Sequence, residues 1–157
     1  MGDFDFDLPP ALDCERYVGG ITNQSIVDSM GMNLTTWMLT KPKLVPFGYP
    51  VIYTSPGDGN TIFTSSKMAR YNLWVANWKV VTPYLPRVWS NEKYFVWQNK
   101  VDEGVSHGLP SGQIDHDLWG LKFPFPGTTP PVNDEIYTEI FIHETNKVYC
   151  GTLKERC

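Results

Sequence analysis

Several features that would identify a function are scarce or missing in this sequence of 157 residues. Only 19% of the residues are charged, and the Lys and Arg residues are scattered singly except for Lys41 and Lys43. A nucleic-acid surface normally gains affinity from a dense basic stripe, so this distribution excludes nucleic acid as an expected partner. No apolar run approaches the roughly 18 residues of a membrane span. The sequence therefore predicts no nucleic-acid partner and no membrane span.

Cysteine and export signals are scarce as well. Cys14, Cys150 and Cys157 are an odd number, widely spaced, and contain no Cys-x-x-Cys pair. We expect free thiols in a reducing compartment, with a bridge from Cys14 to one of the other two left open. The chain begins with alternating acidic residues where a secretory signal is basic. We therefore expect no signal peptide and a location in a virion or the cytoplasm.

Familiar catalytic motifs are also missing, because neither a Gly-x-Ser-x-Gly elbow nor a phosphate-binding glycine loop with its Lys is present. The densest titratable group is His107, Asp115, His116 and Asp117. In an extended segment Asp115 and Asp117 share one side while His116 points away, so the three cannot bind one ion without a turn. We predict no catalytic residue, no metal and no cofactor. A hydrolase that uses His107, His116 and Asp117 is a further alternative.

Aromatic side chains are abundant, above all between Arg70 and Gln98. Arg70–Val81 alternates with apolar residues on both faces, which predicts a buried strand. Trp74 and Trp78 are four residues apart and would share one face of a helix, but the β-branched content and the prolines downstream favour a strand. Lys93–Gln98 predicts a second strand.

The other regular elements that the sequence predicts are short. They are a helix at Thr22–Met32 capped by Thr22 or Asn23, strands at Leu34–Leu39, Val51–Thr54 and Thr61–Ser65, and a hairpin of strands Glu135–His143 and Lys147–Leu153. Ser55–Asn60 has the composition of a hairpin turn. The predicted fold is all-β, a sandwich or partly open barrel of short antiparallel strands with one short helix.

The domain organisation follows from the Pro and Gly content. Residues 1–13 alternate Asp and Phe before Pro9 and Pro10, which predicts an extended N-terminal arm. Residues 14–157 are expected to form a single β-rich domain. Within it, residues 99–134 are rich in Gly and Pro and predict a long irregular segment.

These features lead to a prediction of a non-enzymatic structural or assembly subunit, such as a minor structural protein of a virus or phage particle. Its partners would be other protein subunits of a larger assembly, with a homo-oligomer as an open alternative. The expected partner-binding residues are Phe4, Phe6, Trp89, Phe123 and Phe125.

The main alternative is a glycan-binding β-sandwich module in which exposed tryptophans stack on sugar rings. The candidates for that role are Trp74, Trp78, Trp89, Trp97 and Trp119. Burial decides between the two hypotheses, because a tryptophan enclosed in the core cannot stack on a ligand.

Overall fold

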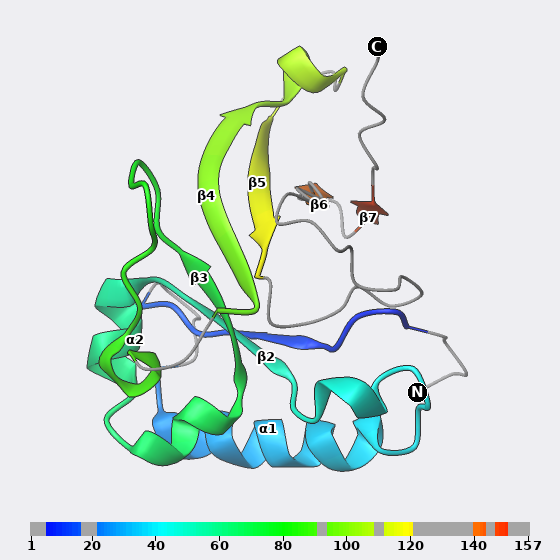
Figure 1. Ribbon diagram of the computed structural model, residues 1–157, viewed down its shortest axis with the longest axis vertical. Coiled ribbons are helices and arrows are strands. Elements are labelled where there is room, and N and C mark those ends of the chain that lie inside the picture. The colour runs from blue at the N-terminus through cyan, green and yellow to red at the C-terminus, as the bar shows by residue number, and fades with distance from the viewer. Residues whose placement is uncertain are drawn as a thin grey trace, which may run out of the picture.

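A computed structural model describes residues 6–16, 22–90, 94–108, 112–120, 140–143 and 147–150, the last two segments as backbone only. Its described residues form one mixed sheet of seven strands in the order β1 to β7 (Figure 1). The strands are β1 Ala11–Asp13, β2 Val51–Thr54, β3 Asn72–Ala76, β4 Val96–Glu103, β5 Gln113–Trp119, β6 Ile140–His143 and β7 Lys147–Cys150. Strands β1 to β4 are parallel, and β4 to β7 pair antiparallel.

Helical segments connect the parallel strands. They are α1 Gln24–Met38 and α2 Pro56–Ile62, with the short 3₁₀ segments η1 Val45–Phe47, η2 Ser66–Arg70 and η3 Arg87–Trp89. A further 3₁₀ segment, η4 Gly104–His107, lies in the chain between β4 and β5, which pair antiparallel. Helix α1 lies between β1 and β2 in the chain, while α2 and η2 lie between β2 and β3 (Figure 1). Parallel neighbours require such crossovers, because a tight turn can only reverse the chain.

The helices cover one face of the parallel strands. Val27 of α1 and Ile62 of α2 pack with the buried strand residues Leu12, Ile52 and Leu73. A second buried cluster joins the alternate strand positions Val51 and Val96 to the segment that follows α1. Its buried members are Met38, Leu44, Phe47, Val51, Phe95 and Val96. Successive residues of β2 therefore contribute to two different clusters, as the period of a strand requires.

Helix α1 is longer than the sequence predicted. Asn23 is its N-cap, as one of the two predicted caps, and its Oδ1 accepts the N–H of Ser25 at 2.9 Å. Gly31, next to the predicted end of the helix at Met32, lies inside α1, where a Cβ would come within 2.5 Å of Cε1 of Tyr71. The glycine thus permits close packing and does not end the helix. The strand predicted at Leu34–Leu39 is wrong, because α1 continues to Met38.

The predicted hairpin around Ser55–Asn60 is wrong for a related reason. Ser55 is an N-cap whose Oγ accepts the N–H of Asp58 at 3.1 Å, and Pro56 occupies the first turn of α2. Serine followed by proline is typical of both a turn and a helix start, so the local composition does not distinguish them. The predicted strand Thr61–Ser65 therefore falls on the end of α2 and the loop after it.

The all-β sandwich or barrel is thus overturned by a mixed sheet with two α-helices. The irregular segment predicted at 99–134 is also wrong in part, since β4 reaches Glu103 and β5 pairs with it antiparallel. Strand β2 is confirmed, and so is the β6–β7 hairpin over the residues that the structure describes. In the described part of the chain, no helix is long and apolar enough to cross a bilayer.

Candidate active site

Polar and aromatic side chains gather on one face of the sheet, near the carboxyl ends of the parallel strands. Asp13 is paired with Tyr53, and Tyr53 with Trp74, so these three share a face. Gln98 of β4 is paired with Asp117 of β5. Trp74 Nε1 donates to Asp117 Oδ1 at 2.7 Å, which joins the two groups. The carboxyl end of a parallel sheet is the usual place for a ligand site.

Tyr53 marks the centre of a carboxyl cluster. Burial is the main reason that the pKa of Tyr53 is raised, and the negative charges of Glu15, Asp115, Asp13 and Asp117 raise it further. These acids come from both ends of the chain's described core, since β1 and the residues after it supply two and β5 supplies two. Four carboxyl groups therefore lie around one phenol.

Gln98 organises the hydrogen bonds beside this cluster. Its buried Oε1 accepts the hydroxyl of Tyr53 at 3.0 Å and the Nε1 of Trp78 at 3.1 Å. The two donors fix the orientation of the amide. Trp78 is half exposed, so one end of this network reaches solvent.

Glu15 has the electrostatic surroundings of a proton donor. Its side chain is half-buried, and burial raises its pKa, as do the charges of Asp13, Asp58 and Asp115. A raised pKa lets a carboxyl hold its proton to higher pH, which is what a general acid requires. Asp13 lies two residues earlier and is exposed. The carboxyl groups of Asp13 and Glu15 therefore have unequal environments.

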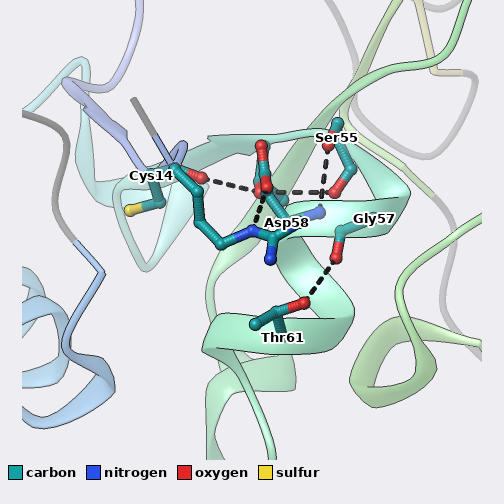
Figure 2. Close-up of polar contacts among 7 residues, drawn as sticks. Cys14, Ser55, Gly57, Asp58 and Thr61 are labelled. Atoms are coloured by element: carbon teal, nitrogen blue, oxygen red, sulfur yellow. Dashed lines mark hydrogen bonds and ion pairs between the residues drawn. The ribbon is translucent and has the colours of Figure 1, made fainter. Parts of the chain in front are cut away.

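The two chain neighbours of Glu15 are held by the end of β2 and by the first turn of α2, where Figure 2 shows the contacts of Cys14 and Asp58. Thr54 Oγ1 donates to the carbonyl oxygen of Cys14 at 2.7 Å, and Arg16 Nε donates to Asp58 Oδ1 at 2.6 Å. Asp58 is itself held in the first turn of α2 by the Ser55 cap. Glu15 therefore lies between two anchored neighbours, which restricts where its carboxyl can point.

Cys14 is a structural residue within this stretch. It carries a free, fully buried thiol whose pKa is raised to about 12 by burial and by the charge of Asp13. A thiol of that pKa stays protonated and is a poor nucleophile. The side chains of Cys150 and Cys157 lie outside the described residues.

Asp117 is the most enclosed acid of the cluster. It is 0% exposed, and burial raises its pKa to about 7, against the opposing effect of the hydrogen bond from Trp74. The charge of Asp115 raises the pKa further. Among the described residues its Oδ2 has no hydrogen-bond partner. Asp117 therefore carries its proton over much of the range below neutrality.

The two described histidines meet on the other face of β5. His116 Nε2 lies 3.0 Å from Asp102 Oδ2, and His107 Nε2 lies 3.6 Å from the same oxygen. The imidazole rings are 5.0 Å apart between centroids. Asp117 follows His116 in a strand and points to the opposite face. The predicted set of His107, His116 and Asp117 does not converge, and Asp102 stands where Asp117 was expected.

Two of the five predicted partner-binding residues, Phe6 and Trp89, lie in the described part of the chain. Phe4, Phe123 and Phe125 lie outside the described residues. Phe6 packs edge-on against the ring of Trp37, with centroids 5.8 Å apart. Trp89 is only 1% exposed, and its Nε1 donates to the carbonyl oxygen of Tyr71 at 3.0 Å. Trp89 is therefore a core residue of the folded chain.

The tryptophans considered for sugar stacking separate by burial. Trp97 is buried and donates to the carbonyl oxygen of Asn77, and Trp119 packs against Phe95. Of the five candidates, Trp74 donates to Asp117 of the carboxyl cluster, and Trp78 donates to Gln98 beside it. Within that set, these two are the ones placed to line a ligand beside the acids.

The sequence reasoning missed Asp13, Glu15, Tyr53 and Gln98. One local signal was available: two acids spaced by one residue directly after the short apolar run that begins at Pro9. Such spacing puts both carboxyl groups on one side of an extended chain. The role of Tyr53 and Gln98 depends on which residues the paired strands place side by side, and local spacing does not predict that register.

Comparison with known proteins gave one likeness. No family model matches the chain, and no curated protein matches it. It is similar to the solved structure of the CTP1L endolysin, with a TM-score of 0.49 and 25% sequence identity. The match covers 72% of this chain and 35% of the endolysin chain, so the chain spans about a third of that protein's length.

The prediction of a non-enzymatic structural or assembly subunit is contradicted by this likeness to an endolysin. The activity of the CTP1L endolysin is regulated by a secondary translation product. The function proposed below rests on the side chains of this chain's own site.

Proposed function

We propose that the chain is a glycoside hydrolase in which Glu15 is the general acid. The observation that carries the proposal is the gathering of Asp13, Glu15, Asp115 and Asp117 around Tyr53, with a raised pKa at Glu15. Hydrolysis of a glycosidic bond needs a protonated carboxyl and an ionised carboxylate on either side of the bond. Unequal environments within one acidic cluster provide that division.

The roles divide by environment. Glu15, half-buried and close to three other acids, donates its proton to the oxygen of the leaving sugar. Asp115 and the exposed Asp13 are the partner carboxyl groups, which stabilise the positive charge that develops at the sugar's anomeric carbon. Asp117 is too enclosed to reach a substrate, and it positions Trp74 by accepting its N–H.

Aromatic side chains beside the acids support a carbohydrate substrate. Trp74 donates to Asp117 of the cluster, and Trp78 donates to Gln98 beside it. The loop after β3 exposes Tyr84 and Val81, the latter at 97%. Flat aromatic faces next to polar groups provide both the apolar contact and the hydrogen bonds that a sugar ring needs. A phosphate or peptide substrate would not require this combination.

The choice of glycans for a first test follows from the same proposal. Bacterial cell walls belong in the panel because an endolysin is a similar structure, and soluble polysaccharides of neutral and N-acetylated sugars complete the panel.

A location in a virion or in the cytoplasm is also a proposal. Fractionation of the source material with an antibody against the chain would test it.

The decisive comparison is Glu15→Gln with the matched control Glu103→Gln, an exposed carboxylate at the end of β4. Release of reducing ends from the best glycan should fall by roughly 10²–10⁴-fold in Glu15→Gln, as general acid catalysis implies. Glu103→Gln should keep wild-type activity. Thermal melts of both variants verify that the fold is retained.

The leaving group sharpens this test. An aryl glycoside whose phenolate leaves without a proton bypasses the general acid, so Glu15→Gln should lose far less activity on it than on the natural bond. Equal losses on both substrates would contradict the acid role. Wild-type activity in Glu15→Gln, or no sugar release by the wild-type chain from any glycan of the panel, would overturn the proposed function.

A further inference from the structure

We propose that Asp102, His107 and His116 form a zinc-binding site on the face of β5 that points away from the carboxyl cluster. Their three ligand atoms all lie within 4.8 Å of one another. The site shares no residue with the proposed glycoside hydrolase machinery. It therefore stands or fails independently of that function.

The distances suit a small closed ion site. A tetrahedral zinc ion with ligands at about 2.0–2.1 Å holds neighbouring ligand atoms roughly 3.3 Å apart. Asp102 Oδ2 is 3.0 Å from His116 Nε2 and 3.6 Å from His107 Nε2, which brackets that spacing. The two imidazole rings are 5.0 Å apart at the centroids, and their ligand atoms lie within 4.8 Å of each other.

The backbone holds the three donors in place. In the β4–β5 ladder Asp102 is paired with Ile114 and Lys100 with His116, so Asp102 and His116 are diagonal neighbours on one face. Segment η4 then brings His107 back over that face. A site built on paired strands is preorganised, which is the condition for tight binding.

The turn that carries His107 has its own constraints. Gly104 donates its N–H to the carbonyl oxygen of Gly112 at 2.8 Å, which closes the end of the ladder. Gly108 ends η4 with a φ of 83°, a left-handed conformation that glycine adopts readily. His107 is thus carried on a short 3₁₀ segment that ends at Gly108.

The donor set selects the metal. Two imidazole nitrogens and one carboxylate oxygen suit Zn²⁺, whereas Ca²⁺ and Mg²⁺ prefer sites made of oxygen ligands. His116 is buried, while His107 and Asp102 reach solvent. Three protein ligands with an accessible side leave a fourth position for water, as zinc sites with open coordination have.

Lys100 provides a substitution that should strengthen zinc binding and not weaken it. Its Nζ lies 3.0 Å from Asp102 Oδ2, the same oxygen that both imidazoles approach. An ammonium at that oxygen competes with a cation, so zinc has to displace it. Lys100→Met should therefore tighten zinc binding, while loss of any donor should weaken it.

The experiment is isothermal titration of the full, chelator-treated chain with zinc chloride. We expect one saturable site, weakened at least about tenfold in His107→Ala and in Asp102→Asn because each loses one of three ligands. Lys100→Met should bind more tightly than the wild type. Glu103→Gln is the matched control and should bind as the wild type does.

Cobalt substitution adds a readout that does not depend on heat. Co²⁺ bound to the proposed ligands should give visible absorption bands that disappear in His107→Ala. The exposed His107 is the preferred variant, because replacing the buried His116 could disturb the fold. No saturable zinc binding, or wild-type binding in His107→Ala, would overturn the site. Glu15→Gln should bind zinc normally, which separates this result from a failure of the hydrolase proposal.

Discussion

Neighbouring residues of β5 experience opposite electrostatic surroundings. Asp117 is enclosed, and its pKa rises to about 7 chiefly through burial. His116 is equally enclosed on the other face but lies against Asp102, which also contacts Lys100. Strand β5 thus carries a buried acid with a raised pKa at Asp117. One residue earlier, on the other face, His116 meets the carboxylate of Asp102 and the imidazole of His107. Alternation along a strand is what allows two chemistries to be separated so closely.

The largest effect that this comparison predicts is a pH-dependent stability set by Asp117. Its pKa is about 7 in the folded chain and near 3.8 when unfolded, so the folded state binds the proton more tightly. The stabilisation that this bound proton gives to the folded state is complete below about pH 4. It is lost as the pH rises through about 7. A shift of about three pKa units corresponds to about 4 kcal/mol as an upper estimate.

Asp117→Asn should remove that pH dependence, because the amide still accepts the N–H of Trp74 through Oδ1 and carries no charge. Urea unfolding at pH 5 and pH 8 measures it. The wild type should lose stability between the two, and Asp117→Asn should stay nearly level and be the more stable at pH 8. Glu103→Gln should keep the wild-type profile. Parallel profiles for wild type and Asp117→Asn would contradict the explanation.

A smaller effect is expected when the donor to Asp117 is removed. The hydrogen bond from Trp74 lowers the pKa of Asp117, so Trp74→Phe should raise that pKa further. The decline of stability should then extend to higher pH than in the wild type. Loss of the bond should also cost about 1–3 kcal/mol at pH 8, where the carboxylate is charged.

Trp78→Phe is the matched control for that measurement. Its Nε1 donates to Gln98 and not to Asp117, so the same ring substitution should leave the pH at which stability declines unchanged. An equal shift in both variants would mean that loss of indole packing, and not the bond to Asp117, controls the profile.

The sequence predicted the parts of the fold that local patterns determine. Alternation identified Val51–Thr54 and the β6–β7 hairpin, and it placed Asp115 and Asp117 on one side with His116 on the other. The two faces compared above were therefore readable from the period of a strand. Helix α2 was missed because a serine cap followed by proline and glycines has the composition of a turn.

The candidate site was not predictable in the same way. Asp13 lies beside Tyr53 through a parallel register between strands about 40 residues apart, which no local pattern encodes. Asp102 reaches His116 only after β4 and β5 pair, and the Gly-rich composition of that region predicted a loop. Sequence patterns thus identified which side chains share a strand face, while the partners across the sheet required the register.

The smallest effect that the comparison predicts concerns the ion pair of Lys100 and Asp102 on β4. Lys100 and Asp102 are both partly exposed, and exposed ion pairs contribute little because water and salt screen them. In the absence of metal, Lys100→Met should leave the melting temperature nearly unchanged, with any difference from wild type vanishing at about 1 M salt, where the screening length is only about 3 Å. A large destabilisation that persists at high salt would mean that the pair behaves as a buried one. The contrast with Asp117 would then rest on something other than burial.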